Sequence, residues 1–201
     1  RKSARLIAQF NPKERSARNV AHHYDIGNDL YRLFLDDDMQ YSCAYFPESG
    51  ASLEQAQQFK KEHIARKLYL APGDRVLDIG CGWGGLALHL CQADGVSVHG
   101  LTLSCEQYDL ACKRAEQLGL GDRVTFQIQD YRSLTGEYDK IVSVGMFEHV
   151  GVPHYQEYFD QISARLSPDG IALVHTIGRS GGPGATNPWI ARHIFPGGYI
   201  P

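Results

Sequence analysis

Between residues 75 and 176 of this 201-residue chain, short apolar runs alternate with helical stretches, and this alternation constrains the fold more than any other feature. The predicted helices cover about 84–93, 104–119 and 153–166. A strand, a helix and a further strand in succession form a βαβ unit with parallel strands, so the pattern predicts an α/β, Rossmann-like, doubly wound and mainly parallel sheet. The predicted strands are Arg75–Ile79, Ser97–Thr102, Val124–Ile128, Lys140–Val144 and Ile171–Thr176.

The chain before this alternation divides into two predicted segments. Residues 1–19 carry many basic side chains and one acidic residue, Glu14. We expect a partly ordered basic arm, with attraction to an anionic membrane surface as the alternative. Residues 20–70 should form an N-terminal helical cap, in which the capping-box sequence Ser52–Gln55 starts a helix that runs to about Leu70. In this cap, 36–38 is a run of three aspartates that we expect to be a solvated turn rather than a metal cluster.

Composition and charge exclude several classes of protein. The 23 acidic and 20 basic residues give a net charge of −3, which argues against a dedicated binder of duplex DNA. The five cysteines are odd in number and lack C-x-x-C spacing, so we expect reduced thiols and no structural zinc site. No apolar run approaches the roughly 18 residues of a membrane span. We therefore expect a cytoplasmic protein without a metal ion or a nucleic-acid partner.

The strongest local signal is the glycine loop Gly80–Gly85, which follows the first predicted strand. Its glycines let the backbone turn sharply and approach a ligand, and the next helix presents free N–H groups to that ligand. The spacing also fits the dinucleotide fingerprint. However, Asp78 at the strand end would repel a pyrophosphate, and the second predicted strand lacks the terminal acid that a nicotinamide ribose requires. Asp78 instead suits an ammonium or a hydroxyl group.

The sequence Asp-Ile-Gly-Cys-Gly-Trp-Gly resembles motif one of the class I S-adenosylmethionine-dependent methyltransferases. This resemblance implies that S-adenosylmethionine is the ligand. The motif would contribute the cofactor-binding residues Asp78, Gly80, Cys81, Gly82 and Gly84.

Further cofactor contacts are expected after the second and third predicted strands. Thr102 and Gln107 lie where the ribose or methionine moiety should sit, although Gln107 belongs to a second capping box with Ser104 and could cap the helix instead. Asp130 can accept a hydrogen bond from an adenine amino group, and Tyr131 can cover a ring face, although an aspartate at a strand end often only forms a turn.

Other polar residues point to chemistry at the same edge of the sheet. Glu148 lies in an apolar stretch after the fourth predicted strand, where a carboxylate is costly unless it has a partner. His175 near the end of the fifth strand fits either a core position or a site. Tyr41, Ser42 and Cys43 lie in a segment that can fold over the domain, although a cysteine alone is often only a small buried hydrophobe.

From about residue 20 onward the chain resembles the cyclopropane-fatty-acyl-phospholipid synthase family, which includes the mycolic acid cyclopropane synthases. Two of the matching sequences, Met-Gln-Tyr-Ser-Cys-Ala-Tyr and Met-Phe-Glu-His-Val-Gly, are specific to this family. The matching segments are His23–Leu30, Met39–Tyr45, Val76–Gly85, Gly145–Gly151, His175–Gly178 and Ile194–Gly198.

The resemblance implies a reaction and a set of site residues. A methyl group from S-adenosylmethionine would be added to a cis double bond of a phospholipid acyl chain, and the resulting carbocation would lose a proton and close a cyclopropane ring. A bound bicarbonate would be the base, held by Cys43, Glu148, His175 and the backbone of Ile177. Glu148 would accept the bicarbonate hydroxyl proton or be protonated itself. Tyr41 and Ser42 would contact the cofactor.

The family pattern also sets the expected domain division and partners. Residues 71–201 would be the catalytic domain, which we expect to be truncated because the family's bicarbonate site includes a tyrosine from a later segment. We also expect the amino-terminal lipid-binding domain of some relatives to be absent, unless residues 1–19 are its last trace. We expect an unsaturated phospholipid as partner and peripheral association with the membrane surface, and a homodimer stays open.

Three hypotheses of function follow. The first is cyclopropanation of membrane lipid. The second is a related methyltransferase that acts on a soluble amine or gives a methyl-branched lipid. The third is a non-catalytic module that binds S-adenosylmethionine.

Overall fold

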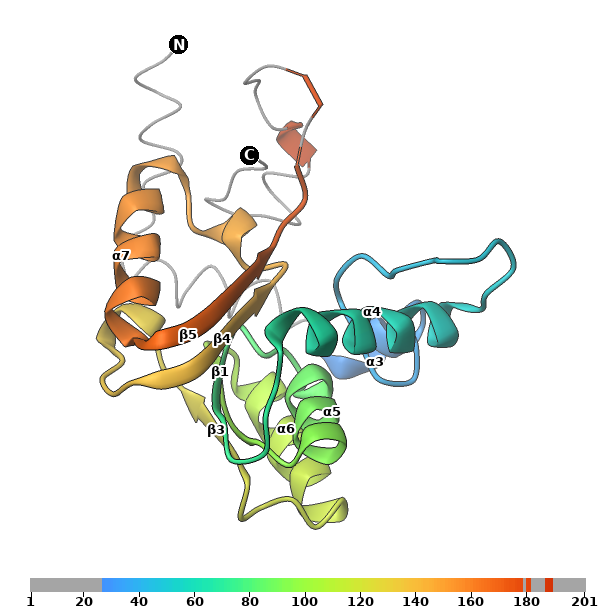
Figure 1. Cartoon of the computed structure of the whole chain (residues 1–201). Helices are drawn as coiled ribbons and strands as arrows, with labels where there is room; N and C mark the ends of the chain where they lie inside the picture. The colour runs from blue at the N-terminus through green and yellow to red at the C-terminus, as the bar shows by residue number, and fades with distance from the viewer. Residues whose placement is uncertain (1–26, 179, 182–186, 190–201) are drawn as a thin grey trace.

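The computed structural model describes residues 27–178, 180–181 and 187–189, and a five-stranded sheet lies at its centre (Figure 1). The strand order is β3-β2-β1-β4-β5, and every neighbouring pair is parallel. The predicted Rossmann-like parallel sheet is therefore confirmed. The strands are β1 (Arg75–Ile79), β2 (Ser97–Thr102), β3 (Val124–Ile128), β4 (Tyr138–Val144) and β5 (Leu166–His175).

Helices cover both faces of this sheet, as Figure 1 shows. Side chains alternate between the two faces of a strand, so Val76 packs on the side of α4, α5 and α6, whereas Leu77 packs on the side of α7. The helices are α3 (Asn28–Arg32), α4 (Leu53–Leu68), α5 (Gly85–Asp94), α6 (Cys105–Gln117) and α7 (Tyr155–Arg165). Short 3₁₀ turns are η1 (Tyr131–Ser133), η2 (Phe147–His149) and η3 (Val152–His154).

Helix α4 begins where the sequence predicts it. Ser52 Oγ accepts a hydrogen bond from the Gln55 N–H at 3.2 Å, and Gln55 Oε1 accepts one from the Ser52 N–H at 2.9 Å. These two bonds satisfy donors that the first turn of a helix otherwise leaves free. The helix ends at Leu68, because Tyr69 adopts a left-handed conformation with φ of 51°.

Two strands begin earlier than predicted. β4 starts at Tyr138, which pairs with Leu166, and the register then shifts before Lys140. β5 starts at Leu166 rather than at the predicted Ile171, and it includes Pro168 and Gly170. β5 is an edge strand of the described sheet, where a proline without an N–H donor is tolerated.

The predicted helical cap has limited helix content in its described part. Over residues 27–70 it contains the short helix α3, the longer helix α4 and a loop between them. The predicted basic arm, 1–19, lies outside the described residues, so the proposed domain division stays a prediction. No described helix is long and apolar enough to cross a membrane.

The expected solvated turn at 36–38 is wrong for two of its three aspartates. Asp36 is buried and its Oδ1 accepts a hydrogen bond from the Gln40 N–H at 2.7 Å. The Asp38 side chain is mostly buried and forms ion pairs with Lys61 and Arg114. In the described part of the chain, no group of histidine, cysteine and acidic residues could hold a metal ion.

Candidate active site

A cavity of about 150 Å³ opens at the carboxyl ends of β1, β2, β3 and β4, where ligands of parallel sheets bind. The residues after these strands form its floor, and the segment around Tyr41 also lines it. All the predicted cofactor-binding residues except Gly84 line this cavity. They are Tyr41, Ser42, Asp78, Gly80, Cys81, Gly82, Thr102, Gln107, Asp130 and Tyr131.

The two glycines Gly82 and Gly84 have different roles in the loop. Gly82 has φ of 55° and lines the cavity. Among the described residues, apart from its two chain neighbours, no heavy atom lies within 4 Å of the place where a Cβ would be. Gly84 also has a positive φ, but a Cβ there would lie 2.7 Å from Cζ of Phe126. The structure therefore places Gly84 in the packing between α5 and β3 rather than in the cavity wall.

Asp78 is the buried acid of this cavity. Its side chain is 1% exposed, and Oδ2 has no hydrogen-bond partner among the described residues. Burial raises the pKa of this carboxyl to about 7, because a charge without solvent or a partner is unfavourable. A ligand that donates a hydrogen bond or brings a positive charge would satisfy the free oxygen.

Gln107 does not use its side chain to complete a capping box. The Thr102 hydroxyl donates to Gln107 Oε1 at 2.6 Å, and the Ser104 N–H donates to Thr102 Oγ1 at 3.2 Å. Ser104 Oγ caps α6 by accepting from the Gln107 N–H at 3.3 Å. The Gln107 side chain is therefore fixed beside Thr102 at the cavity wall.

Arg132 is a site residue that the sequence analysis missed. Asp130 Oδ1 accepts bonds from the Arg132 N–H and Nε, both at 2.9 Å, and Oδ2 accepts from Nη2 at 2.6 Å. The guanidinium carbon also lies 5.6 Å from the centre of the Tyr131 ring. Much of the acceptor capacity expected for an adenine amino group is thus used by Arg132. An acid two positions before an arginine was the available signal, because this spacing permits such a local pair.

Three of the four predicted catalytic residues, Glu148, His175 and Ile177, lie at or just after the ends of β4 and β5. Glu148, in η2, is fully buried, and its Oε1 accepts a hydrogen bond from the Ile177 N–H at 2.7 Å. His175 ends β5 and pairs in register with Val144 at the end of β4. Cys43 is exposed and follows the cavity-lining Ser42. These predicted catalytic residues stand outside the cavity lining itself.

Several buried polar atoms around Glu148 have no partner among the described residues. Glu148 Oε2, His175 Nδ1 and Thr176 Oγ1 belong to this set. Burial raises the pKa of the nearby Tyr158 hydroxyl to about 12, with a hydrogen bond to Ser143 acting against this effect and the Glu148 charge acting with it. Buried polar groups in proteins are normally hydrogen-bonded, so this concentration of unpaired atoms indicates a place for a small polar ligand or water.

Comparison with known proteins agrees with this arrangement. "Cyclopropane-fatty-acyl-phospholipid synthase" of Escherichia coli is 51% identical over 198 residues, which are 98% of this chain and 50% of that protein. "Probable fatty acid methyltransferase" of Pseudomonas putida is 45% identical over 197 residues, 94% of this chain and 50% of that protein. The chain thus spans about half the length of these curated relatives.

A solved structure shares the fold and part of the sequence. The mycolic acid cyclopropane synthase CmaA1, complexed with SAH and CTAB, superposes with a TM-score of 0.85 at 33% identity, covering 96% of this chain and 71% of that one. Residues 11–201 match the family model described as "Mycolic acid cyclopropane synthetase". The chain therefore belongs to the mycolic acid cyclopropane synthetase family.

Proposed function

We propose that this protein uses S-adenosylmethionine to convert a cis double bond in a phospholipid acyl chain into a cyclopropane ring. The observation that carries the proposal is the pairing of a glycine-loop cavity with a buried, incompletely paired carboxylate, Glu148, at the adjoining strand end. Membership of the family and the 51% identity to a cyclopropane-fatty-acyl-phospholipid synthase support it.

The residues of the cavity fit S-adenosylmethionine. Asp78 Oδ2 is an unsatisfied acceptor for an ammonium or hydroxyl group, and Gly82 leaves the space that a side chain would fill. When bound, the cofactor supplies an electrophilic methyl group. A related structure that contains SAH, the demethylated form of this cofactor, also supports this assignment.

The buried atoms behind the cavity fit bicarbonate. Glu148 Oε2 can accept a hydrogen bond from its hydroxyl, and His175 can donate one to its negative oxygen. When bound, bicarbonate supplies a base. The Ile177 N–H already donates to Glu148 in this structure, so we propose that it orients the carboxylate. Cys43 follows the cavity-lining segment and would complete the ligand set.

The chain's residues would assist the reaction through charge and exclusion of water. The product of methyl addition to an alkene is a cation, and loss of one methyl proton lets the two remaining electrons close the ring. Glu148 provides a buried negative charge near this site, which stabilises a cation more strongly than it would in water. A base held in place also avoids the cost of recruiting one from solution.

Exposed apolar side chains support contact with a membrane surface. Leu33 is 81% exposed and Phe34 52% exposed. The Phe34 ring lies 6.2 Å from that of Tyr41, which lines the cavity. An apolar surface beside the cavity suits a substrate that stays in the bilayer, so we propose peripheral association of this face with phospholipid.

A methyl-branched product is the second candidate, because one close relative is named as a probable fatty acid methyltransferase. Mass spectrometry of lipids from cells that express the full-length protein separates the two. Cyclopropanation adds one CH₂ to an unsaturated chain and leaves a product that resists mild hydrogenation. Methyl transfer followed by loss of a different proton gives a branched alkene, which also adds one CH₂ but takes up hydrogen. A saturated branch carries two further hydrogens, which a separate cellular reductant would have to supply. Unchanged lipids in cells that contain folded protein would refute both.

A further inference from the structure

The residues Met39–Cys43, which we name the covering segment, connect the cofactor cavity with a predicted catalytic group. The first four line the cavity, and Cys43 follows. The segment has neither helix nor strand, so no regular backbone hydrogen-bond pattern holds it. Asp36 holds its first two residues, because its carbonyl accepts from the Met39 N–H at 2.8 Å and its Oδ1 from the Gln40 N–H at 2.7 Å, and side chains from other elements hold the rest.

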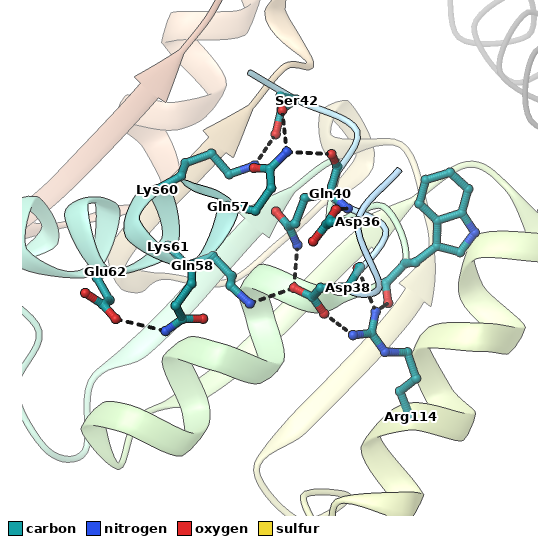
Figure 2. Close-up of polar contacts among 11 residues, drawn as sticks. Asp36, Asp38, Gln40, Ser42, Gln57, Gln58, Lys60, Lys61, Glu62 and Arg114 are labelled. Atoms are coloured by element: carbon teal, nitrogen blue, oxygen red, sulfur yellow. Dashed lines mark hydrogen bonds and ion pairs between the residues drawn. The ribbon is translucent and has the colours of Figure 1, made fainter. Parts of the chain in front are cut away.

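Helix α4 supports the covering segment from one side (Figure 2). Gln57 Nε2 donates to the backbone carbonyls of Gln40 and Ser42 at 3.1 and 3.0 Å. Lys60 Nζ donates to Ser42 Oγ at 2.6 Å. Burial lowers the pKa of Lys60 to about 8, against the effect of the nearby acids Asp36 and Asp38, so water is largely excluded from this contact.

Asp38 lies immediately before the covering segment and is held from two helices. Lys61 Nζ of α4 donates to its Oδ2 at 2.7 Å, and Arg114 of α6 donates to its Oδ1. Gln40, within the segment, also donates to Asp38 Oδ2 at 3.0 Å. Burial would raise the pKa of Asp38, but the hydrogen bonds and charges of Lys61 and Arg114 outweigh it and hold the pKa below its usual value.

Arg114 also joins this aspartate to the glycine loop. Its Nη1 donates to the backbone carbonyl of Trp83 at 2.9 Å and to that of Asp38 at 3.3 Å. Trp83 lies within the loop and lines the cavity. One guanidinium therefore joins Asp38 to the glycine loop, and Figure 2 shows its contacts with Asp38.

Gly85 provides the space in which this arrangement fits. A Cβ at Gly85 would lie 2.5 Å from Asp38 Oδ2 and 2.3 Å from Gln40 Nε2. Gly85 is also the first residue of α5, where a helix favours a negative charge. The absence of a side chain lets the Asp38 carboxylate rest against this first turn.

We propose that Asp38, Lys61 and Arg114 form a charged clamp that positions the covering segment against the glycine loop and thereby sets the affinity for the cofactor. These three are positioning residues, because none of them lines the cavity. Arg114 reaches the glycine loop through its hydrogen bond to the Trp83 carbonyl. The inference rests on the proposed binding of S-adenosylmethionine. It adds that a charge network outside the cavity controls that binding.

The test measures S-adenosylhomocysteine affinity by calorimetry, together with the melting temperature of the unliganded full-length protein. Asp38→Asn keeps the shape of the side chain and removes the charge. Lys61→Met removes one partner and leaves Arg114 in place. We expect each to weaken binding by about tenfold, the order of coupling seen in shared ion-pair networks. Lys61→Arg keeps the charge and should restore most of the affinity.

Glu62→Gln is the matched control on the same helix. Glu62 forms an exposed pair with Arg66, four residues further along α4, and lies outside the cavity lining. Exposed pairs of this kind contribute little to stability. The affinity of Glu62→Gln for S-adenosylhomocysteine should stay within about twofold of the wild-type value.

The outcomes separate this inference from the proposed function. If the wild-type protein binds no S-adenosylhomocysteine, the proposed function fails and the clamp fails with it. If the wild type binds and folded Lys61→Met and Asp38→Asn bind equally well, the clamp alone is wrong. A lower melting temperature with unchanged affinity would mean that the network only stabilises the fold. Should Asp38→Asn not fold, Lys61→Met decides the question.

Gly85→Ala gives an independent check, because alanine suits a helix and the φ of Gly85 is not in the left-handed region. The added methyl group would displace Asp38 and Gln40 without removing any charge. Weaker binding without loss of the fold supports the clamp. Unchanged binding would show that the position of Asp38 does not matter.

Discussion

The backbone N–H of Ile177 donates a hydrogen bond to Glu148 Oε1 over 2.7 Å, and this bond ties the chain after β5 to the turn after β4. One carboxylate oxygen is therefore fixed, while the other, Oε2, is buried without a partner among the described residues. A carboxylate held at one oxygen and open at the other is oriented for a ligand. This geometry makes the two oxygens of Glu148 separable by mutation.

Glu148→Gln should keep the bond from Ile177 and lose the charge. Hydrogen bonds to charged groups contribute about 1.5–3 kcal/mol each, so losing one or two should slow turnover by about ten- to a hundredfold or more. The affinity for S-adenosylhomocysteine should barely change. The measurement is turnover and ligand binding with and without added bicarbonate. Normal turnover, or an equal loss of ligand affinity, would show that the chemistry lies elsewhere.

Glu148→Ala is the matched comparison. It removes the acceptor of the Ile177 N–H as well as the charge, and a hydrogen bond to a charged group contributes about 1.5–3 kcal/mol. We therefore expect a lower melting temperature for Glu148→Ala than for Glu148→Gln. Equal melting temperatures would mean that the Ile177 bond contributes little to the fold.

The raised pKa of Asp78 should make ligand binding depend on pH. Burial raises its pKa to about 7 in the unliganded protein. A ligand that needs the ionised carboxylate must release this proton below the pKa, so affinity should rise with pH and level off above about 7. Calorimetry with S-adenosylhomocysteine from about pH 5.5 to about pH 8.5 measures this. Asp78→Asn should bind weakly and lose this dependence, whereas exposed Asp109→Asn should keep it.

The raised pKa of Asp78 should also make the stability of the unliganded protein depend on pH. Between the usual aspartate pKa near 4 and about 7, the folded state holds a proton that the unfolded state has lost, so stability falls as pH rises through this window. Between about pH 4 and about pH 8, the melting temperature of Asp78→Asn should therefore fall less than that of the wild type. A parallel decline in both proteins would contradict the assignment.

Local patterns were enough to predict most of the fold. β1, β2 and β3 have their predicted bounds, because each is a short apolar run between polar or glycine-rich turns. β5 begins at Leu166 rather than at the predicted Ile171, and its place at the edge of the described sheet makes Pro168 acceptable in the strand.

The candidate site was also predicted only in part. The glycine loop was found because its residues are contiguous and each strand end is a known place for ligands. The clamp at Asp38 was missed, because Lys61 and Arg114 lie 23 and 76 positions away in the sequence. In the sequence, three adjacent aspartates indicate an exposed turn, because only the folded chain places Lys61 and Arg114 beside Asp38. Arg132 was missed for another reason, since Asp130 was expected to bind an adenine amino group or to form a turn. The structure shows that it caps the turn η1 and also pairs with the Arg132 side chain.

The two loop glycines should respond differently to substitution. Gly82→Val places a branched side chain in the cavity at a left-handed position that costs about 1–2 kcal/mol, so ligand binding should be abolished with moderate loss of stability. Gly84→Val would collide with Phe126 and should mainly lower the melting temperature. Calorimetry and thermal unfolding of both variants test this. Unchanged affinity in folded Gly82→Val would make the loop purely structural.

The apolar surface beside the cavity should determine binding to phospholipid vesicles. Burying a large apolar side chain contributes about 1.5–3 kcal/mol, so replacing Leu33 and Phe34 together by serine should lower vesicle binding by at least about tenfold. Leu118→Ser is the control, because Leu118 is also exposed but caps the far end of α6. Co-sedimentation with vesicles of unsaturated phospholipid measures the effect. S-adenosylhomocysteine affinity should stay unchanged in Leu118→Ser, whereas the loss of Phe34 from beside the cavity-lining Tyr41 can also weaken it, so both quantities are measured. Equal vesicle binding by the double variant and by Leu118→Ser would place the membrane contact on another surface.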